Sequence, residues 1–167
     1  PSSLHSFGQE AVRALDTARE KAAKALGADF REIIFTSSAT EANNLALRSA
    51  VRAARNVLHV VDVVNARKRA GASDRTPTTS TTITTPRIVV SSTEHESVLE
   101  TARDLERQGV EVVYLPVDKN GIVNLKKLKE SLNERTVLVS IMYGNNVTGI
   151  IQPIAEISEI IKNFREK

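Results

Sequence analysis

Residues 33–44, with the sequence IIFTSSATEANN, constrain the fold more than any other part of this chain. The apolar residues at the start of this segment predict a buried strand over residues 32–35. The residues that follow predict a helix that begins at Thr40 and continues to about Arg55. Residues 37–39, between the two elements, have small side chains, so a ligand can approach the backbone closely there.

The turn before this helix has the features of a phosphate site. The first N–H groups of a helix have no intrahelical partners, and they lie at the positive end of the helix dipole. A phosphate group is therefore bound favourably at such a position. Thr40 can cap the helix and offer a hydroxyl group, but serine- and threonine-rich turns also cap helices without binding a ligand. On the local pattern alone, both interpretations stay open.

The rest of the chain alternates helices with strands. An amphipathic helix is expected over residues 8–26, with Gly27 as its end. Segment 56–64 is ambiguous between a strand and a continuation of the preceding helix, which we expect to be largely buried. Further strands are predicted over residues 87–90, 110–115 and 136–142, and further helices over 97–108, 125–132 and 154–165.

This alternation predicts an α/β fold of three layers, α/β/α, with helices on both faces of a mainly parallel sheet. Ligands of such sheets bind beyond the carboxyl ends of the strands. Three segments meet that condition, namely residues 37–40, 92–96 and 143–149. We expect the fold to bring these segments to one site.

Residues 66–86 differ in composition from the rest of the chain. They include the basic run 67–69, two prolines and a threonine- and serine-rich run over 76–85. Low hydrophobicity and low complexity predict a solvated, mobile insertion. A threonine-rich phosphorylation platform is an alternative, but the composition favours a plain linker.

The composition excludes several classes of function. The net charge of +3 is mild and aromatic residues make up only 4% of the chain, so no nucleic-acid partner is expected. The absence of cysteine excludes disulfides, thiolate metal sites and a sulfur nucleophile within this sequence. No metal site is predicted, and no apolar run approaches the roughly 18 residues that a membrane span needs. The start at Pro1, without a signal or presequence pattern, is interpreted as a cut from a longer cytoplasmic protein, with the mitochondrial matrix as the alternative.

Four motifs occur in an order that is similar to one enzyme family. They are PSSLHSFG at residues 1–8, FTSSATEANN at 35–44, TEHESVL at 93–99 and LVSIMYGNNVTGIIQPI at 138–154. Together they resemble the class V aminotransferase-type enzymes that use pyridoxal 5'-phosphate (PLP), and specifically the cysteine desulfurases and the related selenocysteine lyases. The resemblance implies an aspartate aminotransferase-like fold of the PLP-dependent transferases. Residues 1–167 would form an incomplete large domain of that fold, with a mobile insertion at about 66–86.

The resemblance also implies the site residues. Ala39 and Thr40 would hold the cofactor phosphate, His95 would lie against the pyridine ring as the catalytic residue, and Asn146 would bind the ring hydroxyl. A flat imidazole can stack on the ring and transfer protons, and an amide can donate to a phenolate-like oxygen. Without the family, His95 would more often be a structural or surface histidine, and Asn146 a turn residue.

Some features depart from the family pattern. Ser38 stands where the family usually has glycine, and Val147 stands where it usually has an acidic residue. By the resemblance, the Schiff-base lysine, the aspartate that holds the pyridinium nitrogen protonated and the persulfide-forming cysteine would all lie beyond Lys167. We therefore expect this chain to contribute to a cofactor pocket and to be inactive by itself.

The resemblance implies that the complete enzyme converts L-cysteine to L-alanine. It would pass the sulfur to an acceptor or scaffold protein for iron–sulfur cluster or thio-cofactor synthesis, and it would be a homodimer. The insertion at 66–86 is also typical of selenocysteine lyases, so L-selenocysteine is the alternative substrate. A second alternative is a non-catalytic, truncated scaffold or binding module.

Overall fold

The computed structural model describes residues 5–69 and 85–166, with side chains described for residues 5–55 and 85–166. The chain forms two compact units, Pro1–Ser38 and Ala39–Lys167, and each is described here by itself. Within these described ranges, no helix is both long and apolar enough to cross a lipid bilayer.

The unit Pro1–Ser38 consists mainly of one helix, α1 (Ser6–Leu26), as the sequence predicts. Gly27 ends the helix in the left-handed conformation, with φ of 65°. A short 3₁₀ helix, η1 (Phe30–Glu32), follows, and the Asp29 carboxylate caps it by accepting from the Arg31 N–H at 2.9 Å. Among the described residues of this unit only Ala23 is buried, so the unit has almost no apolar core of its own.

The predicted strand over residues 32–35 is wrong. Glu32 belongs to η1, and residues 33–35 form no regular secondary structure. A strand is held by hydrogen bonds to a neighbouring strand, and none of the described strands pairs with this segment. The segment is held instead by Arg19, whose Nε donates to the Ile33 carbonyl oxygen at 3.2 Å and whose guanidinium lies 5.5 Å from the ring centroid of Phe35.

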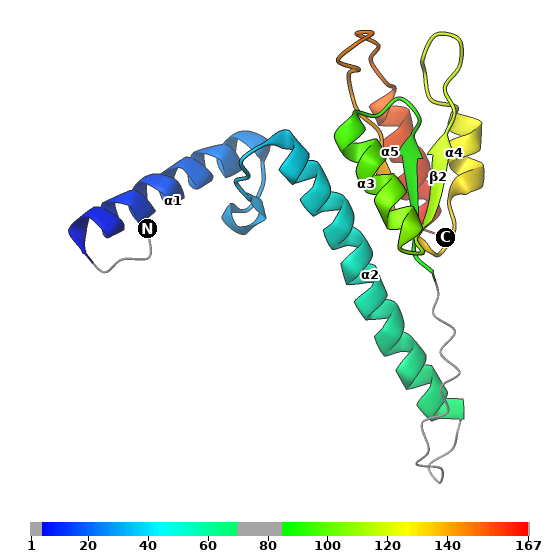
Figure 1. Ribbon diagram of the computed structural model, residues 1–167, viewed down its shortest axis with the longest axis horizontal. Helices are drawn as coiled ribbons and strands as arrows, with labels where there is room; N and C mark the ends of the chain where they lie inside the picture. Colours follow the sequence, from blue (N-terminus) through cyan, green and yellow to red (C-terminus); the bar gives the residue numbers. More distant parts are fainter. Residues whose placement is uncertain (1–4, 70–84, 167) are drawn as a thin grey trace. The chain divides into compact units, whose positions relative to one another are not determined.

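The unit Ala39–Lys167 is built on a parallel sheet with strand order β2-β1-β3 (Figure 1). The three strands are β1 (Arg87–Ser91), β2 (Glu111–Leu115) and β3 (Thr136–Ser140). In the centre of the sheet, Val89 pairs with Val113 on one side and with Val139 on the other. These strands and their parallel pairing confirm the sequence prediction.

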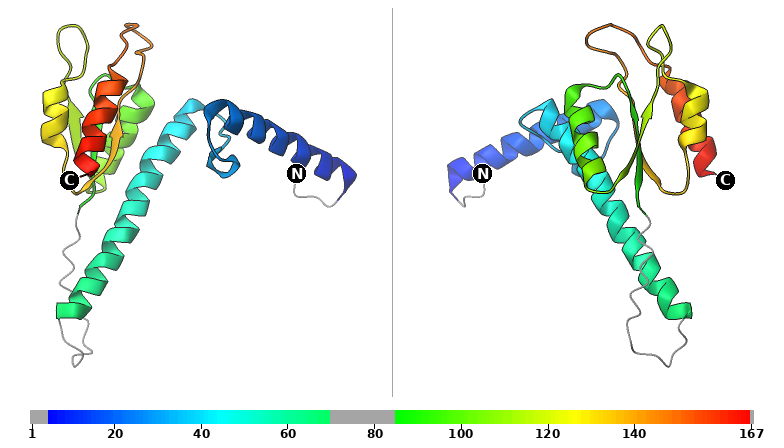
Figure 2. Two further views of the ribbon diagram at one scale, coloured as in Figure 1. Left: turned by 180° about the vertical axis from the view of Figure 1, so that it is seen from behind. Right: turned by 45° about the vertical axis from the view of Figure 1, so that its right-hand side comes forward.

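Helices cover both faces of this sheet, which confirms the predicted three-layer α/β/α fold (Figure 2). On one face, α2 (Ala39–Arg69) and α3 (Glu96–Arg107) pack against Ile88 and Val90. On the other face, α4 (Leu125–Ser131) and α5 (Ile154–Arg165) pack against Val89. Because neighbouring side chains of a strand point to opposite faces, one five-residue strand supplies both cores.

Helix α2 differs from the prediction in two ways. It continues to Arg69, so the ambiguous segment 56–64 is helical, and so is the start of the predicted insertion. The remainder of that insertion up to residue 84 lies outside the described residues, and Pro86 at its end is buried. The expectation that the helix is largely buried is also wrong. Over residues 39–55 only Leu47 and Val51 are buried, because one narrow stripe of the helix faces the core.

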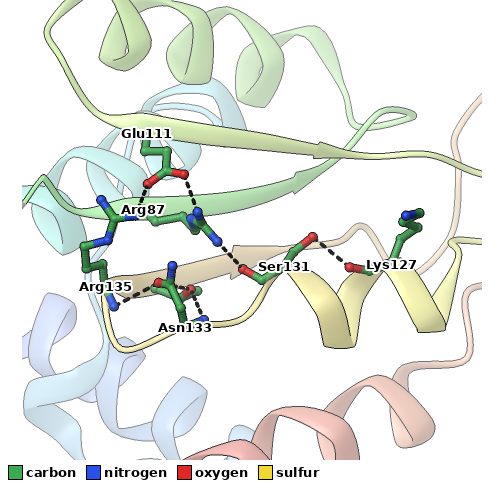
Figure 3. A network of polar contacts seen from close by, with 7 residues as sticks. Arg87, Glu111, Lys127, Ser131, Asn133 and Arg135 are labelled. Carbon is green, nitrogen blue, oxygen red and sulfur yellow. Dashed lines mark hydrogen bonds and ion pairs between the residues drawn. The ribbon is translucent and has the colours of Figure 1, made fainter.

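An ion cluster ties the amino ends of the three strands together (Figure 3). The Glu111 carboxylate at the start of β2 binds the guanidinium of Arg87 in β1 and, at 2.9 Å, that of Arg135 immediately before β3. Arg87 also donates to the Ser131 carbonyl oxygen at 2.8 Å. The hydrogen bond from Arg87 holds the pKa of Glu111 below its ordinary value, although partial burial opposes this. The cluster lies at the opposite end of the strands from the candidate site.

Candidate cofactor site

Three segments of the unit Ala39–Lys167 form the candidate site. They are the first turn of α2, the loop 92–95 between β1 and α3, and the loop 141–153 between β3 and α5. The loops after β1 and β3 lie at the same end of the sheet, because these neighbouring strands are parallel (Figure 1). Of the predicted phosphate segment, Ala39 and Thr40 belong to this unit, whereas Ser37 and Ser38 belong to the other.

Ala39 and Thr40 are the first two residues of α2, and both are exposed. The helix thus begins one residue earlier than predicted, and Thr40 lies inside the first turn. Its hydroxyl is therefore close to the first-turn N–H groups at the positive end of the helix dipole. The Asn44 amide donates to the Thr40 carbonyl oxygen at 3.0 Å, which stabilises this turn.

His95 is the N-cap residue of α3, with an extended backbone (φ −63°, ψ 147°). Its Nδ1 accepts from the backbone N–H of Ser97 at 3.1 Å, and the Ser97 hydroxyl oxygen lies 2.9 Å from the same nitrogen. The Asn43 amide of α2 donates to that hydroxyl oxygen at 2.8 Å. Residues of two helices therefore hold the imidazole, and one of these residues lies in the first turns of α2.

Asn145 holds the loop after β3 in place. Its amide nitrogen donates to the Thr93 carbonyl oxygen at 3.0 Å. Its side-chain oxygen accepts from the N–H groups of Val147 and Thr148, each at 2.9 Å. Asn146, the residue predicted to bind the ring hydroxyl, is exposed and has no hydrogen-bond partner within the part of the chain that the structure describes. The first asparagine therefore supports the loop, and the second leaves its amide available to a ligand.

Glu94 makes the second contact between the two loops. Its side chain is buried, and its carboxylate accepts from the N–H group of Met142 at the end of β3. Burial raises the pKa of Glu94, and the hydrogen bond from Met142 opposes this only in part. Asn145 of one loop binds Thr93 of the other, and Glu94 of the second loop binds Met142 of the first. The loops that contain His95 and Asn146 are therefore hydrogen-bonded to each other.

Sequence reasoning predicted Ala39, Thr40, His95 and Asn146 as site residues but assigned no role to the residues that support them. The supporting residues all lie inside the same motifs, and they are Asn43, Glu94, Ser97 and Asn145. Two of them, Glu94 and Asn145, are directly next to a predicted contact residue, and this was the available signal. Motif spacing alone cannot distinguish a residue that faces a ligand from one that holds the loop.

The donor groups of the site match a phosphorylated aromatic ligand. Backbone N–H groups and a hydroxyl at a helix start suit a phosphate, and an exposed imidazole and an exposed amide suit a heteroaromatic ring with a hydroxyl. Among the described residues, no group of three or more histidine, cysteine, aspartate or glutamate side chains could hold a metal ion. The described residues therefore fit PLP, the cofactor that the sequence motifs indicate.

The fold is that of an α/β domain like those of the PLP-dependent transferases. The sequence model of the aminotransferase class V family matches residues 1–67 and 79–166. The chain belongs to this family, whose members in general use PLP. Residues 68–78, inside the predicted insertion, lie outside the match.

Relatives narrow the similarity to the cysteine desulfurases. The putative cysteine desulfurase IscS 1 of Bacillus subtilis is 40% identical over 165 residues, which are 99% of this chain and 36% of that relative. A solved NifS-like protein has a TM-score of 0.78 at 36% identity and covers 99% of this chain and 38% of its own. The structure of SspA in complex with cysteine has a TM-score of 0.75 at 30% identity, with 99% and 40% covered.

These comparisons confirm the resemblance to cysteine desulfurases that the four motifs predict. They also show how much of a relative the chain corresponds to, since it spans little more than a third of the length of the relatives that it matches. The roles of Ala39, Thr40, His95 and Asn146 stay predictions.

Proposed function

We propose that this chain is part of a PLP-dependent cysteine desulfurase, which releases L-alanine from L-cysteine and passes the sulfur to an acceptor protein. The observation that carries the proposal is the convergence of three motifs of that family at one end of the sheet, with His95 hydrogen-bonded through Ser97 to α2. The relative SspA, solved in complex with cysteine, supports L-cysteine over L-selenocysteine as the substrate.

Each exposed group has a role in this proposal. The first-turn N–H groups at Ala39 and Thr40, together with the Thr40 hydroxyl, bind the phosphate. The imidazole of His95 lies against the pyridine ring and holds or releases a proton near the substrate. The Asn146 amide donates to the ring hydroxyl. When bound, PLP withdraws electrons from the amino acid substrate, so that its bonds to the α and β carbons can be broken.

The chain does not contain every group that the reaction needs. It has no cysteine, so the thiol that takes the sulfur must come from outside this sequence. The family resemblance places the Schiff-base lysine outside it as well. The complete enzyme is proposed to be a homodimer that delivers sulfur for iron–sulfur cluster or thio-cofactor synthesis. This chain by itself is expected to form no L-alanine.

Cofactor binding by this chain gives the first test. We would measure PLP affinity by equilibrium dialysis for the unaltered chain, for Thr40→Val and for His95→Ala. Each variant should bind roughly tenfold more weakly, since each removes a direct contact whose loss costs about 1–2 kcal/mol. Ser158→Ala, an exposed serine on α5, is the matched control and should not change the affinity. Equal affinity in all four proteins would contradict the proposed phosphate and ring contacts.

Activity of the whole protein gives the second test. The coding sequence on both flanks would be expressed with this segment, and L-alanine would be measured from L-cysteine and from L-selenocysteine. L-cysteine should be turned over, and His95→Ala should abolish most of the activity. A whole protein that binds PLP but turns over neither substrate would instead favour the non-catalytic alternative.

A further inference from the structure

A chain of hydrogen bonds connects the first turns of α2 with the imidazole of His95. Asn43 Nδ2 donates to Ser97 Oγ at 2.8 Å, and Ser97 Oγ lies 2.9 Å from His95 Nδ1. The backbone N–H of Ser97 donates to the same ring nitrogen at 3.1 Å. Ser97 is thus the residue through which the helix start and the imidazole are coupled.

These bonds determine where the imidazole carries its proton. A backbone N–H group can only donate, so His95 Nδ1 must present a lone pair. The Asn43 amide occupies one lone pair of the Ser97 hydroxyl oxygen and leaves the hydroxyl hydrogen free to point at Nδ1. Both donors of Ser97 then meet one acceptor. The neutral imidazole is therefore held with its proton on Nε2.

The opposite nitrogen of the ring is available to a ligand. His95 is exposed, and within the described ranges no residue forms a hydrogen bond with Nε2. We propose that Asn43 and Ser97 are positioning residues that keep Nδ1 as an acceptor, so that Nε2 is the nitrogen that exchanges a proton with the bound ligand. This inference rests on the proposed function, in which His95 lies against the cofactor ring.

The hydrogen bond from Asn43 to Ser97 also links the proposed phosphate site to His95. Asn43 lies three residues after Thr40, so the helix that would hold the phosphate also orients the imidazole. The distance between the phosphate contacts and the imidazole is then set by helix α2 and by two side-chain hydrogen bonds, Asn43 to Ser97 and Ser97 to His95. Proton transfer depends steeply on such placement.

The tautomer of His95 can be measured directly on this chain without cofactor. Histidine ¹⁵N chemical shifts from long-range ¹H–¹⁵N spectra, recorded at about pH 9 where histidine is ordinarily neutral, report which ring nitrogen carries the proton. In the unaltered chain Nε2 should be protonated. Ser97→Ala keeps the backbone donor and removes the hydroxyl, so the ratio of the Nε2–H to the Nδ1–H tautomer should fall about fivefold. Ser97→Thr restores a hydroxyl and should restore the ratio.

Asn43→Asp tests the direction of the chain of bonds. A carboxylate can only accept, so it would take the Ser97 hydroxyl hydrogen away from Nδ1. The tautomer ratio should then fall at least as far as in Ser97→Ala. Asn44→Asp is the matched control, because the neighbouring amide binds the Thr40 carbonyl oxygen and Arg48 instead. This control should leave the ratio of His95 unchanged.

Two results would overturn the inference. One is an unaltered chain in which His95 carries its proton on Nδ1. The other is an unchanged tautomer ratio in both Ser97→Ala and Asn43→Asp, with amide spectra that show both variants to be folded. Since no cofactor enters the measurement, these results are independent of PLP affinity. If the unaltered chain failed to bind PLP but showed the expected tautomer ratio, the proposed function would be contradicted. The positioning role of Ser97 would still be supported.

Discussion

At the scale of single residues, two glutamates of the same sheet unit have opposite electrostatic roles. Glu94 is 8% exposed, and burial raises its pKa, since a charged carboxylate is poorly solvated there. Glu111 lies between two arginines, and the Arg87 hydrogen bond lowers its pKa. One carboxylate supports the candidate site and the other joins the far ends of the strands. Their contributions to stability therefore respond to pH in opposite directions.

In the unaltered chain, the buried carboxyl group of Glu94 should lower the unfolding free energy as the pH rises. Glu94→Gln should remove this pH dependence. Because the pKa of Glu94 is raised on folding, the folded state holds its proton more tightly, and stability falls as the pH rises from about 4.5 through the raised value. Glutamine can still accept from the Met142 N–H, so the variant should be more stable at pH 7 by about 1 kcal/mol. Urea unfolding at pH 4.5 and 7 would measure this. Glu159→Gln, an exposed control on α5, should show the pH dependence of the unaltered chain.

Glu111→Gln should be destabilising and should reduce the loss of stability in acid. The pKa of Glu111 is lowered on folding, so its contribution is present above the ordinary value and is lost as the pH falls below it. Removing the charge leaves Arg87, which is 16% exposed, without its counter-ion, at a cost of roughly 1–3 kcal/mol at pH 7. Glu130→Gln breaks an exposed pair with Lys127 and is the control. Equal unfolding free energies in the two variants would show that the cluster contributes nothing.

At the scale of elements, buried Gln152 connects the turn after β2 with the candidate-site loop. Its amide donates to the Gly121 carbonyl oxygen at 2.7 Å, and its side-chain oxygen accepts from the Val123 N–H at 3.0 Å. Gly121 has φ of 76°, and a Cβ at this position would lie 2.5 Å from the Ile150 side chain. The left-handed backbone therefore requires glycine in this turn, and a Cβ there would also displace the terminal methyl group of Ile150.

Gly121→Ala should destabilise the chain more than Gly109→Ala does. Both glycines have positive φ, and alanine costs about 1 kcal/mol at such a position. Only at Gly121 does the added methyl group meet a side chain, the terminal methyl group of Ile150, which must move and so should add up to about 1 kcal/mol. Thermal unfolding of the two variants gives the comparison. If both lose the same stability, the contact with Ile150 has no energetic consequence.

At the scale of the whole molecule, both units expose large apolar side chains. Phe7 is 84% and Leu26 74% exposed in the unit Pro1–Ser38, and Val147 is 85% exposed in the other. Contiguous patches of exposed apolar side chains are typical of surfaces that bind another protein. The proposed homodimer and the rest of the proposed enzyme are the partners that such surfaces would meet.

The isolated chain should therefore associate in solution. Sedimentation velocity over a range of concentrations should show an average mass that increases with concentration. Phe7→Ser should weaken the association, and Ser158→Ala should not. A single monomeric species at all concentrations would contradict this prediction and would weaken the case for a protein partner at α1.

The sequence predicted those helices and strands whose formation depends on residue patterns within the element itself. The predicted helix over residues 154–165 has the same bounds as α5, and the three strands of the sheet were predicted within one or two residues at each end. Apolar periodicity and end signals such as Gly27 act over a few neighbouring residues, so they can be predicted from the sequence alone. The same holds for the four motifs that indicate the family.

Tertiary structure decided what depends on contacts between distant residues. The strand expected over residues 32–35 did not form, because strand pairing needs a neighbour that no local pattern supplies. The hydrogen bonds from Asn43 to Ser97 and from Asn145 to Thr93 each join residues about 50 positions apart in the sequence. Sequence alone therefore determined which residue types reach the candidate site. Packing alone decided which of them are exposed at the candidate site and which hold the others in place.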